Sequence, residues 1–139
     1  MVRREVVSQK VTRAAGHLND AAALIERSVD AFIADIQGRD LAAFYLMLSI
    51  QECIDLAAHW VADAGWTPAP DAAGAFDELA DRGAIGRDLA GILRGAVGLR
   101  NRIAHGYSGI DHRRLHQEAS AGIPALRLFL AAAATAAGL

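Results

Sequence analysis

Two arginines, an asparagine, a histidine and a tyrosine lie within eight residues of this chain, from Arg100 to Tyr107. Polar side chains of these types are costly to bury without partners and are not needed for packing. A histidine titrates near neutral pH and can take or give a proton, whereas an arginine keeps its charge and can bind two phosphate oxygens at once. This combination suits the holding of a phosphodiester and the movement of protons around it.

RNA cleavage would use each residue type in a different way. A histidine accepts the proton of the 2′-hydroxyl or protonates the leaving 5′-oxygen, and an arginine stabilises the added charge of the pentavalent transition state. An asparagine orients the phosphate or the histidine, and a tyrosine forms a hydrogen bond or stacks on a base. Arg100, Asn101 and His105 are therefore candidates for this chemistry, and Arg102 either contacts phosphate or is solvated. This route needs no metal and no cofactor.

The spacing of these residues limits how they can meet. Asn101 and His105 are four residues apart, so they share a face of a helix. Arg100 and His105 are five apart, so their Cα positions differ by about 140° around the axis. They converge only if the helix ends between them or if a second copy of the chain supplies the missing groups. A two-fold dimer would form such a shared cleft.

Composition favours a helical protein. The 139 residues suit one domain over 1–139, and 53% are hydrophobic although only 6% are aromatic, with Pro limited to 3. Cys53 is the single cysteine, which excludes an internal disulfide. The first residues are charged and no apolar run follows, so we expect a cytoplasmic protein. No uncharged run reaches the roughly 20 apolar residues of a membrane span.

Charge is divided unevenly along the chain. Residues 1–81 carry 6 Lys/Arg against 13 Asp/Glu, and residues 82–139 carry 8 Arg against 3 Asp/Glu. The basic half contains the polar segment, where it would attract phosphates. Charge complementation between helices of the same chain explains the division equally well.

Helical periodicity places the polar segment at the end of an apolar helix, and no segment alternates with period two. The fold class we expect is all-α, an antiparallel bundle of about five helices with short connections. The first expected helix covers 5–37, with a break near Ser28 and an end at Gly38, and a central helix runs from an Asp40 cap to 64. A loop over 65–70 and a short helix over 72–80 follow. The next helix covers 87–105 and is closed by Gly106 in a left-handed conformation, and the last covers 112–134, capped by Asp111 and with a bend at Pro124.

Four further residues have chemistry to be weighed. His112 and His116 are four apart, a spacing that can bind a metal, but no third ligand is evident and two arginines lie between them, so we expect an exposed helix face. Glu52 and Asp55 lie in the central apolar helix. Either can pair with the motif arginines or simply be solvated.

The segment Arg100-Asn101-x-x-x-His105-x-Tyr107 resembles the signature of the HEPN superfamily, and specifically of HepT-like toxins. The similarity extends from about residue 40 to 116. It includes the Tyr-x-x-x-Ser-Ile-Gln-Glu-Cys-Ile-Asp helix, the Gly-Trp-Thr-Pro loop, the Phe-Asp-x-Leu helix and the Ile-Asp start of the last helix. The four motif positions show no departure, whereas the first forty residues match only in being helical.

The resemblance implies a homodimeric, metal-independent endoribonuclease whose Arg100 and His105, supported by Asn101, line a cleft between two subunits. It implies a toxin of a two-gene system, with RNA as substrate and a minimal nucleotidyltransferase as antitoxin. That antitoxin would silence the toxin by adding AMP to Tyr107. The alternative is a non-catalytic subunit that binds nucleotide or substrate for a nucleotidyltransferase, and RNA turnover by the isolated chain separates the two.

Overall fold

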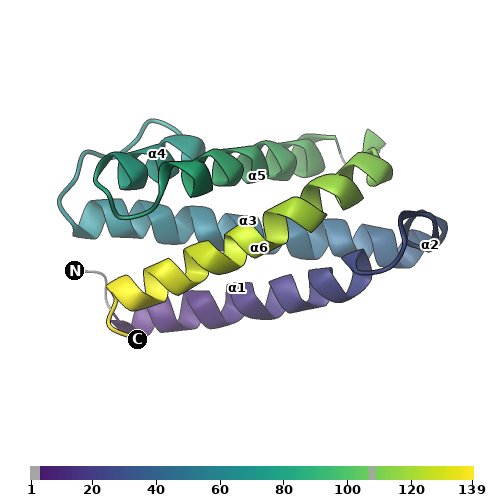
Figure 1. Cartoon of the computed structure of the whole chain (residues 1–139), viewed down its shortest axis with the longest axis horizontal. Coiled ribbons are helices and arrows are strands. Elements are labelled where there is room, and N and C mark those ends of the chain that lie inside the picture. Colours follow the sequence, from purple (N-terminus) through teal and green to yellow (C-terminus); the bar gives the residue numbers. More distant parts are fainter. Residues whose placement is uncertain (1–3, 107–108) are drawn as a thin grey trace.

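In the computed structural model, which describes residues 4–106 and 109–139, the chain forms a bundle of helices, with no strand in that part (Figure 1). The helices are α1 (Arg4–Ile25), α2 (Val29–Ala34), α3 (Ile36–Asp63), α4 (Ala72–Asp81), α5 (Arg87–His105) and α6 (His112–Ala136). The predicted all-α bundle is confirmed. Six helices replace the expected five because the break near Ser28 sets off the short α2, whose first turn Ser28 caps through the Ala31 N–H at 3.2 Å.

The central position belongs to α3, which contacts all five other helices. Its buried positions cover several faces, since a helix surrounded by others must be apolar nearly all round. These positions are Gly38, Ala42, Ala43, Leu46, Ser49, Ile50, Cys53, Ile54, Leu56, Ala57 and Val61. Phe32, Phe76 and Phe129 are the largest fully buried side chains around it. Small alanines on α3 let its neighbours approach closely, which fits a core with few aromatic residues.

The start of α3 differs from the prediction. Gly38 does not end a helix, and Asp35, not Asp40, is the N-cap: its carboxylate accepts the Gly38 N–H at 3.0 Å. That hydrogen bond, with the ion pair to Arg27, holds the pKa of Asp35 below its usual value. A Cβ on Gly38 would lie 2.8 Å from the Asp35 Cγ, so the close approach requires glycine. Periodicity misses this cap because the interruption is only one residue long.

The other predicted boundaries hold within two residues, with one correction at the end of α5. Asp111 caps α6 through the Arg114 N–H at 3.0 Å, and Pro124 lies inside α6. Gly106 follows α5 but has φ −119°, so the predicted left-handed cap is wrong. Its N–H donates to the Arg102 carbonyl at 2.8 Å, and a Cβ there would lie 2.9 Å from that oxygen. Glycine is needed at this position for space, not for a positive φ.

Two helices, α3 and α6, are long and apolar enough to cross a membrane by length and composition alone. In the bundle, 50% of the most apolar window of α3 and 39% of that of α6 are buried against other helices. Core helices of soluble proteins pass the same test. Packing inside the fold accounts for half of that window in α3 and for a smaller share in α6.

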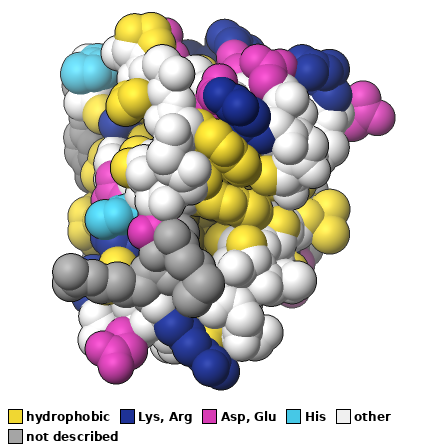
Figure 2. All heavy atoms as spheres, turned by 90° about the vertical axis from the view of Figure 1, so that its left-hand side faces the viewer, with side chains coloured by type: hydrophobic (Ala, Val, Ile, Leu, Met, Phe, Trp, Pro, Cys, Tyr) yellow, Lys and Arg dark blue, Asp and Glu magenta, His cyan; other side chains and the backbone are white. Residues whose placement is uncertain are grey.

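The two ends of the bundle differ in chemistry. The chain termini lie together at one end, and the end of α5 and the start of α6 lie at the other (Figure 1). Figure 2 views the end with the termini, where apolar side chains reach the surface between charged ones. The described residues of the predicted site all lie on the last turns of α5, at the opposite end. The site is therefore positioned by α5, α6 and the middle of α3.

Replacing Gly38 by alanine tests the cap at the start of α3. The new Cβ would displace the Asp35 carboxylate, so the variant should lose about 1 kcal/mol of unfolding free energy, a typical value for a lost N-cap. Chemical denaturation monitored by circular dichroism measures it. Gly16→Ala is the matched control, because nothing lies within 4 Å of that added Cβ in α1, and it should gain about 0.5–1 kcal/mol. Equal stabilisation by both changes would contradict the cap.

Candidate functional site

The last turns of α5 divide their side chains between the core and the surface. Leu93, Ala96, Val97, Leu99 and Ile103 are buried and form the apolar face of this helix. This face packs against α3, α4 and α6. The turn from Arg100 to His105 then presents Asn101, Arg102 and His105 to solvent, while Arg100 is half-buried. The polar segment is thus split by the helix itself.

Arg100 is directed toward α3. Its Nη1 donates to Oε1 of Gln51 at 2.7 Å, and its Nε is buried without a hydrogen-bond partner in the described structure. Nε2 of Gln51 in turn donates to Oδ1 of Asp55 at 3.1 Å. Arg100 is therefore held by a neutral amide, which leaves its charge uncompensated at that contact.

Glu52 and Asp55 do not pair with the motif arginines, so that expectation is wrong. Glu52 lies 3.5 Å from Lys10 Nζ and 3.4 Å from Arg13 Nη1, both on α1. Asp55 lies 3.9 Å from the same Lys10 amine. Both carboxylates contact cations of α1, because they lie on the side of α3 that faces that helix. Gln51, which sequence reasoning missed, lies on the side that faces α5.

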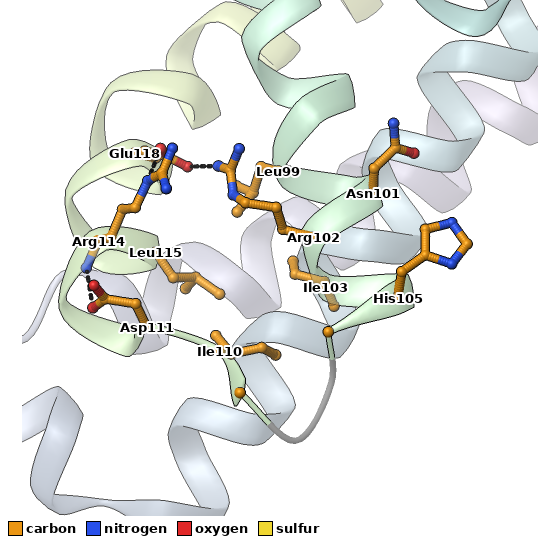
Figure 3. A pocket seen from close by; sticks show the side chains of 12 residues that line it. Leu99, Asn101, Arg102, Ile103, His105, Ile110, Asp111, Arg114, Leu115 and Glu118 are labelled. Atoms are coloured by element: carbon orange, nitrogen blue, oxygen red, sulfur yellow. Dashed lines mark hydrogen bonds and ion pairs between the residues drawn. The ribbon is translucent and has the colours of Figure 1, made fainter.

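Asn101 and His105 project from the same side of α5, as their four-residue spacing predicts (Figure 3). Both belong to the rim of a pocket of about 520 Å³ between the end of α5 and the start of α6. The lining is part apolar and part polar: Leu99, Ile103, Ile110 and Leu115 on one hand, and Asn101, Arg102, His105, Asp111, Arg114 and Glu118 on the other, with Gly106 and Gly109. The pocket can hold a group of nucleotide size.

Arg102 points the other way, toward α6 (Figure 3). Its Nη2 forms an ion pair with Glu118, whose second oxygen accepts from Arg114 Nε at 2.8 Å. One carboxylate thus joins two guanidinium groups on the wall of the pocket. Arg114 and Glu118 were not predicted as part of the site, although their spacing of four on one helix is a readable ion-pair signal.

The structure therefore brings together only part of the predicted set. Asn101, Arg102 and His105 line one pocket, and Arg100 is absent from its lining. Tyr107 lies outside the described residues. In the described part of one chain, the predicted catalytic pair of Arg100 and His105 does not converge on a single point.

The charges of the basic half are largely compensated from within the fold. Arg82, Arg87, Arg94 and Arg113 form ion pairs with carboxylates of the acidic half. Arg100 forms no ion pair with a carboxylate among residues 4–106 and 109–139, and its partner is an amide. The uneven division of charge is thus mostly internal complementation, and Arg100 is an exception to it.

Neither His112 nor His116 lies on an exposed helix face, contrary to expectation. The Nε2 atom of His116 lies 3.0 Å from the Arg27 carbonyl oxygen, and its ring lies 5.2 Å from that of Phe32. His112 lies 3.6 Å from Asp40 Oδ1 and is only 16% exposed. No group of three metal-ligating side chains occurs among the described residues. His116 thus contacts the segment between α1 and α3, and His112 contacts the start of α3, so both hold the first turns of α6 in place.

Cys53 is unsuited to act as a nucleophile. It is buried in the core on α3. Burial, with the nearby charge of Glu52, raises the pKa of its thiol to about 12. A thiol that stays protonated is a packing residue, because the thiolate is the reactive form.

Comparison with known proteins bears on these features. The family model of HepT-like ribonucleases matches residues 15–133. An AMPylated HEPN toxin from Shewanella oneidensis, solved with its MNT antitoxin, superposes with a TM-score of 0.83 at 19% identity, covering 91% of this chain and 95% of that one. A toxin–antitoxin complex with AMP-PNP gives 0.81 at 18% identity, with coverages of 92% and 97%. No curated protein matches the sequence.

The superposed structures share the all-α bundle of this chain. The family match covers most of the chain and is more specific. The chain belongs to the HepT-like ribonuclease family. The resemblance drawn from its sequence motifs is confirmed.

His112 should make stability depend on pH near neutrality. Burial, reinforced by the charge of Arg39, lowers its pKa, and the exposed Asp40 and Asp111 act in the opposite direction without reversing the shift. Because the folded pKa lies below the unfolded one, the contribution is complete above the ordinary value of 6.5 and is lost as pH falls. The free energy of unfolding should therefore decline as the pH is lowered from about 7 through the ordinary histidine pKa of 6.5.

Urea titrations across this range measure the decline, which should be shallower in His112→Gln. His59→Gln is the control, because His59 is an exposed histidine on α3. A pH dependence that is the same in His112→Gln as in the unaltered protein would contradict the assignment to His112.

Proposed function

We propose that this chain is a metal-independent endoribonuclease toxin of a two-gene toxin–antitoxin system, acting as a homodimer of single-domain chains (1–139) in the cytoplasm. One observation carries the proposal: α5 ends in Arg-Asn-x-x-x-His with Asn101 and His105 open to a pocket and Arg100 charged and held by an amide. Membership in a family of ribonucleases supports RNA as the substrate.

Cleavage follows from acid–base chemistry at the phosphodiester. The 2′-oxygen attacks phosphorus as its proton is removed, the bond from phosphorus to the 5′-oxygen breaks, and that oxygen is protonated. His105 moves the proton at one of these two atoms, and Arg100 stabilises the charge that builds on the phosphoryl oxygens. Asn101, on the same helix face as His105, orients the phosphate or the imidazole. Arg102 contacts a neighbouring phosphate by exchanging its ion pair with Glu118.

Two copies of the chain would supply the complete site. In one copy, Arg100 faces α3, whereas His105 is exposed to solvent at the rim of the pocket. A two-fold axis near the end of α5 would bring the motifs of both copies into one cleft. The partner subunit's His105 would then serve as the second proton-transfer group. The divergence of the two residues within one chain supports this arrangement.

The proposed partner is a minimal nucleotidyltransferase antitoxin that adds AMP to Tyr107. The solved relatives support it, because one is an AMPylated HEPN toxin bound to an MNT antitoxin and another is a toxin–antitoxin complex with AMP-PNP. Tyr107 lies two residues after His105 in the sequence. An adenylate on it would put negative charge next to the residues that bind the RNA phosphate, which would repel the substrate.

Replacing His105 by alanine should abolish RNA cleavage by the purified chain. General acid–base groups contribute about 10² to 10⁴-fold to rate, so a fall of that size is expected. Cleavage of a labelled RNA in the presence of a chelator provides the measurement. His59→Ala, on the exposed face of α3, should retain full activity. Activity that the chelator removes would rule out the metal-independent mechanism, and RNA binding without turnover would favour the non-catalytic alternative.

Tyr107→Phe should escape modification by the antitoxin. Co-expression with a nucleotidyltransferase encoded beside the gene should add the mass of one or more adenylates to the unaltered chain, and intact-mass spectrometry should find none on the variant. The Tyr45→Phe variant, altered in a half-buried tyrosine of α3, should still be modified. Adenylates found on Tyr107→Phe would place the modification at another residue.

A further inference from the structure

The contact between Arg100 and α3 is specific in its chemistry. Gln51 accepts from Arg100 Nη1 at 2.7 Å through Oε1, and its Nε2 donates to Asp55 Oδ1 at 3.1 Å. Both bonds are part-buried. The three side chains form a chain of hydrogen bonds from α5 to the middle of α3.

The chemistry of the two neighbours fixes the orientation of the Gln51 amide. A guanidinium only donates hydrogen bonds, and an ionised carboxylate only accepts them. The amide must therefore present its oxygen to Arg100 and its nitrogen to Asp55. The opposite orientation would place the amide NH₂ against the guanidinium, donor against donor, and the amide oxygen against the carboxylate, acceptor against acceptor. Asp55 thus acts on Arg100 through Gln51, at a distance and without an ion pair.

The carboxylate end of this chain is itself anchored to a third helix. Lys10 Nζ on α1 lies 3.9 Å from Asp55 Oδ2 and 3.5 Å from Glu52 Oε2. The Lys10 amine is partly shielded, with its side chain 21% exposed. The position of Arg100 therefore depends on contacts that run through α3 to α1.

A neutral partner has a consequence that a carboxylate would not have. An arginine paired with Glu or Asp is bound in a charge-assisted contact that an incoming phosphate must displace. Gln51 fixes the guanidinium with one hydrogen bond and leaves the net charge of the group intact. The Nε of Arg100 stays buried without a hydrogen-bond partner. This is the arrangement expected for an arginine that must be aimed but not neutralised.

We propose that Gln51, oriented by Asp55, is a positioning residue that holds Arg100 for the reacting phosphate. The proposal rests on the proposed ribonuclease function. It assigns to α3 a part in the site that the motif on α5 does not contain.

Three variants of the full-length chain test the proposal through the kinetics of RNA cleavage. Gln51→Ala leaves Arg100 charged but removes the hydrogen bond that fixes its orientation, so kcat and kcat/KM should fall together by about tenfold. A fall of this size corresponds to the loss of one hydrogen bond to a charged group. Gln51→Glu keeps the size and the acceptor but pairs Arg100 with a charge, so the fall should reach about a hundredfold. Asp55→Asn lets the amide turn either way and should give a smaller fall in the same direction.

The order of the variants separates positioning from packing. If Gln51 only filled space, the nearly isosteric Gln51→Glu would be milder than Gln51→Ala. The reverse order supports the proposal, and a milder Gln51→Glu or three unchanged kcat values overturn it. Gln37→Glu is the matched control, because this glutamine is exposed in the first turn of α3, and its kcat should equal that of the unaltered chain.

A second measurement does not depend on catalysis. Nitrogen-15 NMR of the Arg100 side chain should show slow rotation of the guanidinium in the unaltered chain and fast rotation in Gln51→Ala. If the unaltered chain does not cleave RNA, the proposed function fails, and the NMR result still decides whether Gln51 holds Arg100. If it does cleave RNA but rotation is fast in both proteins, the positioning role is overturned and the function stands.

Discussion

The packing of α3 against five other helices is the constraint on which the rest of the structure depends. The sides of α3 that face these helices are apolar, apart from the turn that carries Gln51, Glu52 and Asp55, whereas residues such as His59 lie on its exposed face. Polar groups at such a position need partners, because the desolvation penalty of a buried unpaired group exceeds the net stabilisation that a typical hydrogen bond provides. Lysine and arginine from α1 meet the two carboxylates, and Arg100 from α5 meets the amide. The interior chemistry of α3 thereby decides which way Arg100 points.

The geometry of α5 has an equally direct effect on the site. Its apolar face packs inward, so side chains a turn and a half apart must diverge: Arg100 lies toward α3 and His105 toward solvent. Rotating α5 as a whole would not change the angle between the two residues, and it would expose Leu99 and Ile103, which are buried. A site that needs both groups on one phosphate is therefore more readily built between two chains than within one. This is a geometric argument for the proposed dimer, and it is independent of the family likeness.

Much of this arrangement is readable from the sequence, and the parts that are not have physical causes. Periodicity predicts the long helices because apolar spacing reports the buried face, and Asp111 is a local signal for the start of α6. The cap at Asp35 escapes this reading because one residue separates two helices. Gln51 escapes it because an amide in an apolar helix has no preferred partner until the fold brings Arg100 to it. Glu52 and Asp55 attract attention by their charge, yet the direction in which each faces depends on tertiary packing alone.

The division of charge along the chain shows why net charge is a poor guide to a phosphate site. Four arginines of the basic half form ion pairs with carboxylates of the acidic half, and Arg102 and Arg114 both pair with Glu118. Arg100 and Arg127 instead have amide partners, Gln51 and Asn19, and Arg127 is exposed. A half-buried guanidinium is less screened by water than an exposed one, so its field on a nearby anion is stronger. In the proposed site, the uncompensated charge is that of Arg100, whose partner on α3 is an amide, and a count of basic residues would not identify it.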